Sequence, residues 1–342
     1  MLHRYFTINW IVGPRYDLFF FIGSFILTFL FYGLYKWLVY LGFAATGTSA
    51  LVTYFIFTAF FDQPHIFQTF SRTHADKEEF QNRKYTYTIG LFLLILVGLV
   101  LTAKGYIKEL VIFTAIFGSY HVIRQHYGFL RAYHRKNADN HPIDFYIDST
   151  MFYSGMFAFF FGNFTKTDKP TLIYGELSVH FPGTPEIVSL ILWKVFLASL
   201  IVFLLRQFHL ISIGKKINLP KFLLLFAALS SHFFVFFATE TTFLVAEALE
   251  TSYHTVQYQG WIAQYQVKKF PEVKAVAYKW FFVAVAYGLL SAVIEVYELL
   301  SYTWAMYLFV PFAMIILFHY YIDGFIWRFG KDKPMRDLML RK

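Results

Sequence analysis

Long apolar segments follow one another along almost the whole chain, and they limit the folds that are open to it. A helix needs about 20 apolar residues to cross a bilayer, and ten segments of the chain come close to that length. They cover residues 17–42, 48–71, 85–103, 107–130, 145–164, 186–207, 221–238, 241–265, 279–300 and 303–327. The sequence therefore predicts an all-α, polytopic integral membrane bundle of about ten transmembrane helices. We expect residues 1–342 to form one transmembrane domain.

The composition supports this class. Hydrophobic residues make up 58% of the chain and charged residues 15%, whereas a soluble domain has about 25% charged residues. There is no cysteine, which excludes disulfides, thiolate metal ligands and iron–sulfur clusters. Any metal must therefore be held by nitrogen and oxygen.

The distribution of basic residues predicts the orientation. With ten spans, most of them fall in segments that face one side: Arg4, Arg15, Arg72, Lys77, Arg83, Lys84, Arg131, Arg135, Lys136, Arg206, Lys215, Lys216, Lys221, Lys268, Lys269, Lys274, Lys279 and the tail from Arg328 to Lys342. The other side holds little beyond Lys104, Lys108, Lys166 and Lys169. By the positive-inside rule, both termini are cytoplasmic, as in a protein of the bacterial inner (plasma) membrane. The net charge of +9 is thus a topology signal and does not indicate nucleic acid as a partner.

Four expected spans carry a histidine near one end: His65, His121, His254 and His319. They precede the next basic boundary by seven, ten, fourteen and nine residues, respectively. At about 1.5 Å per helical residue, all four lie roughly 10–21 Å below that boundary. Ionisable groups inside a membrane are costly, so they indicate a functional site. We expect one shared metal site in the cytoplasmic leaflet.

Helical spacing predicts the partners of these histidines, because residues three, four or seven apart share a helix face. Carboxylate and histidine pairs at such spacing present metal ligands in helical bundles. The expected ligands are His65, His121, His254, His319, Glu250 and Asp323. The residues expected to orient them are Asp62, Gln68, Gln125, Gln257 and Glu247. Further candidates are His126, His232 and Arg124.

Simpler roles remain open for some of these residues. His232, beside Ser231, can serve as a hydrogen-bonding packing residue. Glu247 and Glu250 can act as counterions of Arg124. Outside the site, we expect His3, His134, His141, His180 and His209 to be solvated, and Glu295 and Glu298 to lie at the membrane interface.

An internal echo links the segments 107–136 and 241–269. Ser119-Tyr-His121, Gln125 and Gly128-Phe129 resemble Ser252-Tyr-His254, Gln257 and Gly260-Trp261, with a gap of one residue. The echo indicates either a duplicated helix or a coincidence in a biased composition.

The residue types favour an oxygenase. No HExxH, GxSxG, Walker or GxGxxG pattern is present, so proteolysis, serine hydrolysis and nucleotide chemistry have no motif. Iron (Fe²⁺) held by histidine and carboxylate activates oxygen, and the bilayer would deliver a lipid or isoprenoid substrate sideways. Zinc, manganese, copper and haem b are the alternative cofactors. A transporter or channel that uses the cluster as a proton or metal-ion relay is the alternative function. Docking of an electron donor on the basic cytoplasmic face is left open.

The order of the histidine motifs resembles that of the bacterial and archaeal membrane β-carotene 15,15′-dioxygenases related to the bacteriorhodopsin-related protein. The counterparts of the family's motifs are Pro64-His65, His121, His254 and His319-Tyr-Tyr-Ile-Asp323-Gly-Phe325-Ile-Trp-Arg328. The likeness extends over about forty motif residues around them. The family's later helix carries two histidines one turn apart, where this chain has His254 and Gln257. The resemblance implies a multi-helix membrane enzyme with iron held by histidines and a carotenoid-like substrate.

Overall fold

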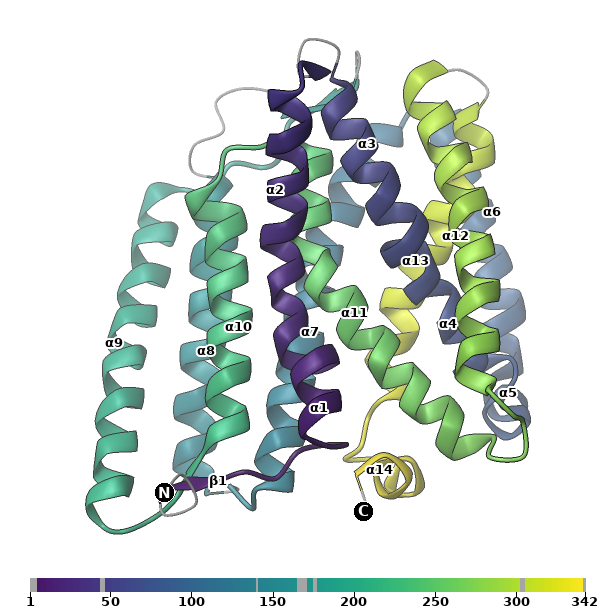
Figure 1. The fold of residues 1–342 in the computed structure, drawn as a ribbon. Coiled ribbons are helices and arrows are strands. Elements are labelled where there is room, and N and C mark those ends of the chain that lie inside the picture. Colours follow the sequence, from purple (N-terminus) through teal and green to yellow (C-terminus); the bar gives the residue numbers. More distant parts are fainter. Residues whose placement is uncertain are drawn as a thin grey trace.

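The computed structural model describes residues 5–43, 47–139, 141–164, 171–174, 177–301 and 305–340, which are mostly helical (Figure 1). The predicted all-α fold class is confirmed. The helices are α1 (Pro14–Tyr16), η2 (Asp17–Ile22), η3 (Gly23–Phe25), α2 (Ile26–Tyr40), α3 (Thr48–Phe57), η5 (Thr58–Asp62), α4 (Gln63–Thr73), α5 (Lys77–Tyr85), η6 (Thr86–Gly90), α6 (Leu91–Ala103), α7 (Ile107–Lys136), α8 (Pro142–Phe164), α9 (Glu186–Ser212), α10 (Leu219–Phe233), η7 (Phe234–Ala238), α11 (Phe243–Lys269), α12 (Val276–Ser301), α13 (Ala305–Ile326) and α14 (Lys333–Leu340). Strand β1 (Phe6–Thr7) pairs in parallel with β4 (Ile217–Asn218), and β2 (Thr171–Tyr174) pairs antiparallel with β3 (Leu177–Val179).

Short π-helical and 3₁₀ turns join the helices end to end, so that the described residues form ten rods and the short helix α14. Each segment expected to be a span coincides with one rod. Six rods are long and apolar enough to cross a membrane: Pro14–Tyr40, Lys77–Ala103, Glu186–Ser212, Leu219–Ala238, Val276–Tyr297 and Met306–Ile326. Within the described part of the chain, the rods of α4, α7 and α11 are not among these six. Polar residues interrupt their apolar runs, and these helices carry three of the four site histidines.

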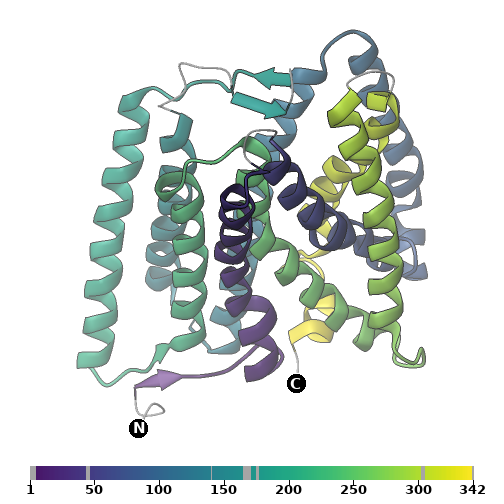
Figure 2. The same ribbon diagram turned by 45° about the horizontal axis from the view of Figure 1, so that its top comes forward.

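Helix α11 crosses the middle of the bundle obliquely (Figures 1 and 2). Every residue from Ser252 to Ile262 is buried, whereas a surface helix buries only one stripe. Helices α2, α3, α4, α7 and α12 pack around it. The polar residues of α11 therefore face other helices and need partners inside the bundle.

A glycine lets α12 pack directly against the turn that precedes His65. A Cβ atom on Gly288 would overlap the carbonyl oxygen of Ala59 in η5 and would lie 2.8 Å from Cδ of Pro64. Real Cβ atoms do not approach other atoms this closely, so the contact requires glycine. This packing holds η5 and the first turn of α4 in place.

We expect Gly288→Ala to destabilise the protein by about 1–3 kcal/mol, because α12 must move away from η5 or strain its backbone. Thermal unfolding of the detergent-purified protein measures the effect. The matched control is Gly33→Ala on α2, where an added Cβ meets no atom within 4 Å. An unchanged unfolding midpoint for Gly288→Ala would show that the packing tolerates a methyl group.

Both chain termini lie at the same end of the bundle, which we call the terminal end (Figure 1). There, the buried Arg72 at the end of α4 pairs with Asp76 at 3.1 Å and Glu79 at 3.1 Å. Burial alone would raise the pKa of Asp76, but the hydrogen bond from Tyr265 and the charge of Lys269 hold that pKa below its usual value. These contacts fix the end of α4 against α5 and α11.

Candidate metal centre

Four histidine side chains from four helices meet inside the bundle. His65 lies on α4, His121 on α7, His254 on α11 and His319 on α13, and all four are buried. Their ring centroids form a closed cycle, with 5.1 Å between His65 and His254, 4.9 Å between His254 and His121, 5.0 Å between His121 and His319, and 5.0 Å between His319 and His65. We call these four residues the histidine cluster.

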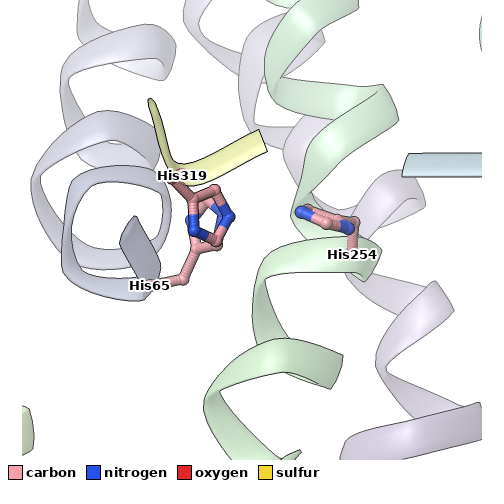
Figure 3. A group of neighbouring side chains, drawn as sticks. All are labelled: His65, His254 and His319. Atoms are coloured by element: carbon pink, nitrogen blue, oxygen red, sulfur yellow. The ribbon is translucent and has the colours of Figure 1, made fainter. Parts of the chain in front are cut away.

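Each neighbouring pair of rings is spaced like two ligands of one metal ion, and the ligand atoms fall into two groups, one with His65, His254 and His319 and one with His121, His319 and Asp323. A metal binds an imidazole nitrogen at about 2.1 Å, which puts the ring centroid about 3.2 Å from the ion. Neighbouring rings around such an ion then have centroids about 4.5–5.2 Å apart in square or tetrahedral geometry. The observed distances of 4.9–5.1 Å fall in this range. Figure 3 shows His254 pointing a ring nitrogen toward His65 and His319, and the ligand atoms of these three residues lie within 4.8 Å of one another.

Unpaired nitrogens also indicate a bound ligand. The Nε2 atoms of His65, His121 and His319 and the Nδ1 atom of His254 are buried and have no hydrogen-bond partner among the described residues. Buried polar atoms are almost always paired, with protein, water or an ion. A metal ion would satisfy several of these nitrogens at once.

In two of the imidazoles, the second ring nitrogen forms a hydrogen bond with the protein. The Nδ1–H of His65 donates to the backbone carbonyl oxygen of Asp62. Because that oxygen can only accept, neutral His65 carries its proton on Nδ1 and keeps a free lone pair on Nε2. His319 Nδ1 lies 2.9 Å from Thr69 Oγ1, which also lies 2.8 Å from the hydroxyl of Tyr258. Such contacts orient metal-binding imidazoles.

Asp323 lies beside the cluster, one turn after His319 on α13. Its Oδ2 atom is 3.7 Å from His319 Nε2 and 3.8 Å from His121 Nε2. Its Oδ1 atom accepts a hydrogen bond of 3.1 Å from Tyr258. His121, His319 and Asp323 therefore form a second group with metal-ligand geometry, which shares His319 with the first.

Glu250 does not belong to either group of described ligand atoms. Its carboxylate accepts a hydrogen bond of 2.9 Å from Ser119 and lies 3.9 Å from Nδ1 of His232. It lines a separate cavity of about 240 Å³ together with Asp62, Glu247 and Glu295. We call this the acidic cavity, defined by those four carboxylates.

The glutamines differ from their expected role as imidazole partners. Gln125 donates to the backbone carbonyl of His254 at 2.9 Å, and Gln257 donates to that of Phe21 at 2.7 Å. The side-chain oxygen of Gln257 lies 2.8 Å from His126 Nδ1. Gln68 is buried, and its Nε2 atom has no partner among the described residues. For His319, the side chain of Thr69 provides the orienting contact instead.

The further candidates lie around the cluster. His126 packs on Tyr253, with ring centroids 4.6 Å apart, and His232 lies near Glu250. Arg124 donates to the hydroxyl of Tyr153 at 2.6 Å. No described carboxylate forms an ion pair with Arg124, so the alternative role of Glu247 and Glu250 as its counterions is not observed.

Sequence reasoning missed Thr69 and Tyr258, although a signal was present. Each lies four residues after a cluster histidine, Thr69 after His65 and Tyr258 after His254, and so shares its helix face. The expectation that Glu295 lies at the interface is wrong, because its side chain is buried and accepts a hydrogen bond of 2.7 Å from Tyr54.

His134 was also expected to be solvated, and this is wrong. His134 is buried, with Nε2 2.9 Å from Asp148 Oδ2. His134, Asp139 and Asp148 form a third group with ligand-like spacing. The ammonium of Lys221 occupies the position of a cation between the two carboxylates, at 2.9 Å from Asp139 and 2.8 Å from Asp148. This group is therefore a buried ion cluster and does not need a metal.

No protein-family model, curated protein or solved structure matches this chain.

Proposed function

We propose that the chain is an integral membrane, metal-dependent oxygenase, with non-haem iron as the metal and a lipid or isoprenoid as the substrate. The observation that carries this proposal is the convergence of four buried imidazoles, each with one ring nitrogen that lacks a hydrogen-bond partner among the described residues. Imidazole and carboxylate are ligands that suit iron. The motif resemblance to the membrane β-carotene dioxygenases supports the same chemistry.

The proposed topology has ten spans with both termini in the cytoplasm of a bacterial plasma membrane. The placement of both termini at one end of the bundle supports an even number of crossings. The excess of basic residues expected on that side supports its cytoplasmic orientation. The histidine cluster would then lie within the membrane.

Bound iron would supply oxygen activation, and the residues of the chain prepare the site for it. The carbonyl of Asp62 and the hydroxyl of Thr69 fix the rings of His65 and His319. Tyr258 donates to Asp323, whose other oxygen faces His121 and His319. Asp323 can therefore serve as a ligand or hold a proton beside the cluster. Burial of these groups excludes bulk water.

The geometry disfavours the haem alternative. The four rings form one tight cycle, with neighbouring centroids 4.9–5.1 Å apart. A porphyrin ligated by two of them would occupy the space of the other two. Metal analysis and an absorption spectrum of detergent-purified protein test the proposal: about one or two irons per chain, without a haem absorption band, are expected. Protein that keeps its fold but binds no metal would contradict it.

We expect Thr69→Val to weaken metal binding by about 10–100-fold, because His319 loses the contact that orients its ring. Valine keeps the shape of threonine and removes only the hydroxyl. Competition with a chelator measures the affinity. Thr69→Ser keeps the hydroxyl and is the matched control, which should bind metal like the wild type. Equal affinity in all three proteins would contradict the orienting role of Thr69.

A relay function is the second candidate, and the acidic cavity favours it. Four carboxylates face this cavity, and Asp62 Oδ1 also lies 3.6 Å from Nδ1 of His65. Polar groups thus continue from the cluster into another part of the bundle, as an ion pathway requires. Proton or metal flux into proteoliposomes, lost in His121→Ala and in Glu247→Gln, would support this function. Retained metal without any flux would favour the oxygenase.

A further inference from the structure

A second cavity, of about 500 Å³, reaches the histidine cluster from another side. Its lining includes His121, Tyr258 and Asp323. Its other walls come from α7, α11, α13 and the segment that follows α13. Four arginines also line it, namely Arg124, Arg131, Arg135 and Arg328. We call it the basic cavity, defined by these four arginines.

The four arginines share the described lining of the basic cavity with one carboxylate, that of Asp323. No ion pair joins any of the four arginines to a carboxylate within the described residues. Nη1 of Arg131 is buried without a hydrogen-bond partner there, and its guanidinium lies 4.0 Å from the ring centroid of Phe145. Partial burial, with repulsion from Arg131 and Arg336, lowers the pKa of Arg135 below its usual value. An anion bound between these groups would relieve both the repulsion and the missing hydrogen bonds.

The remaining walls of the basic cavity are aromatic. They include Phe117, Tyr127, Phe129 and Trp261. Tyr120 and Tyr321, on α7 and α13, also line the cavity and are 44% and 58% exposed on the outer surface of the bundle. An apolar chain can therefore enter between α7 and α13 from the side, which is where a bilayer would lie.

We propose that the basic cavity binds an anionic amphiphile, whose carboxylate or phosphate head group is held by Arg131 and Arg135 and whose apolar chain extends to His121 and Asp323. This inference rests on the proposed function, since it names the substrate class of the same site. The described lining of the acidic cavity includes no arginine or lysine, so the basic cavity is the one that offers cations to the head group.

The spacing along α7 also predicts where the chain is oxidised. Arg131 lies ten residues after His121 on this helix, a rise of about 15 Å. An extended hydrocarbon chain of that length has roughly a dozen carbons. We therefore expect reaction in the middle of a long chain, far from the head group.

Equilibrium binding to the purified, metal-loaded protein tests the inference. The probes are radiolabelled oleate, oleyl phosphate and the neutral oleyl alcohol. The first variant is the double change Arg131→Gln/Arg135→Gln. Because Arg131 packs on Phe145, this change can also disturb the packing of α7. The second variant is therefore the single change Arg135→Gln, at an exposed residue. The control is Lys274→Gln/Lys279→Gln, which removes two exposed charges from the loop and helix start between α11 and α12. Metal content and elution profile check that each variant is folded.

We expect wild-type protein to bind oleate or oleyl phosphate at least tenfold more tightly than oleyl alcohol. The preference should fall at least tenfold in the double variant and about threefold in Arg135→Gln, and persist in the lysine control. Whichever anion binds more tightly identifies the head group. Equal affinity for the alcohol, or an unchanged preference in the double variant, overturns the inference while leaving the metal centre intact. Anion preference in protein that cannot bind metal would overturn the proposed function alone.

Discussion

Replacing His254 or His319 by alanine should reduce the bound metal of the purified protein to less than a tenth of the wild-type amount. Each change removes one ring of the histidine cluster, whose neighbouring centroids are 4.9–5.1 Å apart. The remaining ligands cannot complete the coordination, and His319 also belongs to the group that includes Asp323. Metal analysis after purification in detergent measures the loss.

The matched control is His126→Gln, which changes a buried histidine of α7 that contacts Gln257 and lies outside the ligand groups found among the described residues. It should retain the wild-type metal content. If His254→Ala and His319→Ala also retain it, the histidine cluster is not the metal site. If all three variants lose metal, the loss can be attributed to reduced folding of the protein. Comparison of the unfolding midpoints of the three variants tests this.

Lys221→Met should destabilise the protein by about 3–5 kcal/mol, because it leaves buried carboxylates without their cation. The ammonium of Lys221 is 1% exposed and lies 2.8 Å from Asp148 and 2.9 Å from Asp139. Methionine keeps much of the side-chain length and removes the ammonium, with its charge and its hydrogen bond to Asp148. Thermal unfolding in detergent, with a fall in the midpoint, measures the effect.

Lys216→Met removes an exposed lysine from the adjoining loop and should leave the midpoint unchanged. A second comparison uses Lys221→Met with Asp148→Asn, which removes one of the unpaired charges and should restore part of the stability. Lys221→Met with an unchanged midpoint would mean that the carboxylates are neutral or hydrated in the folded protein.

The central residues of the site could be predicted because imidazoles are rare and costly inside apolar helices. Spacing of three or four residues then identified Asp323 as a neighbour of His319. The same rule predicted Glu250 as a ligand, because it shares a helix face with His254, but Glu250 belongs to neither ligand group of the histidine cluster. Glu250 instead accepts a hydrogen bond from Ser119 of α7 and lines the acidic cavity, so the neighbouring helix and not the spacing decides its role.

Contacts between helices could not be predicted in the same way. A helix face identifies which residues point together and does not identify the neighbouring helix. Thus Gln257 meets His126 and the backbone of Phe21, while Thr69, from α4, meets His319. Counting basic residues for topology treats each one as exposed, and so it missed that Lys221 is buried.

The central helices have a consequence for how the protein is made. The rods of α4, α7 and α11 are too polar to be among the six apolar rods found in the described residues, so each depends on neighbours to enter a bilayer stably. His65 and His319 are 254 residues apart in the chain, and translation at about 5–20 residues per second separates their synthesis by roughly 10–50 s. Until α13 emerges, the imidazoles of the earlier helices lack their last partner. Under the proposed function, metal insertion would therefore follow the synthesis of α13.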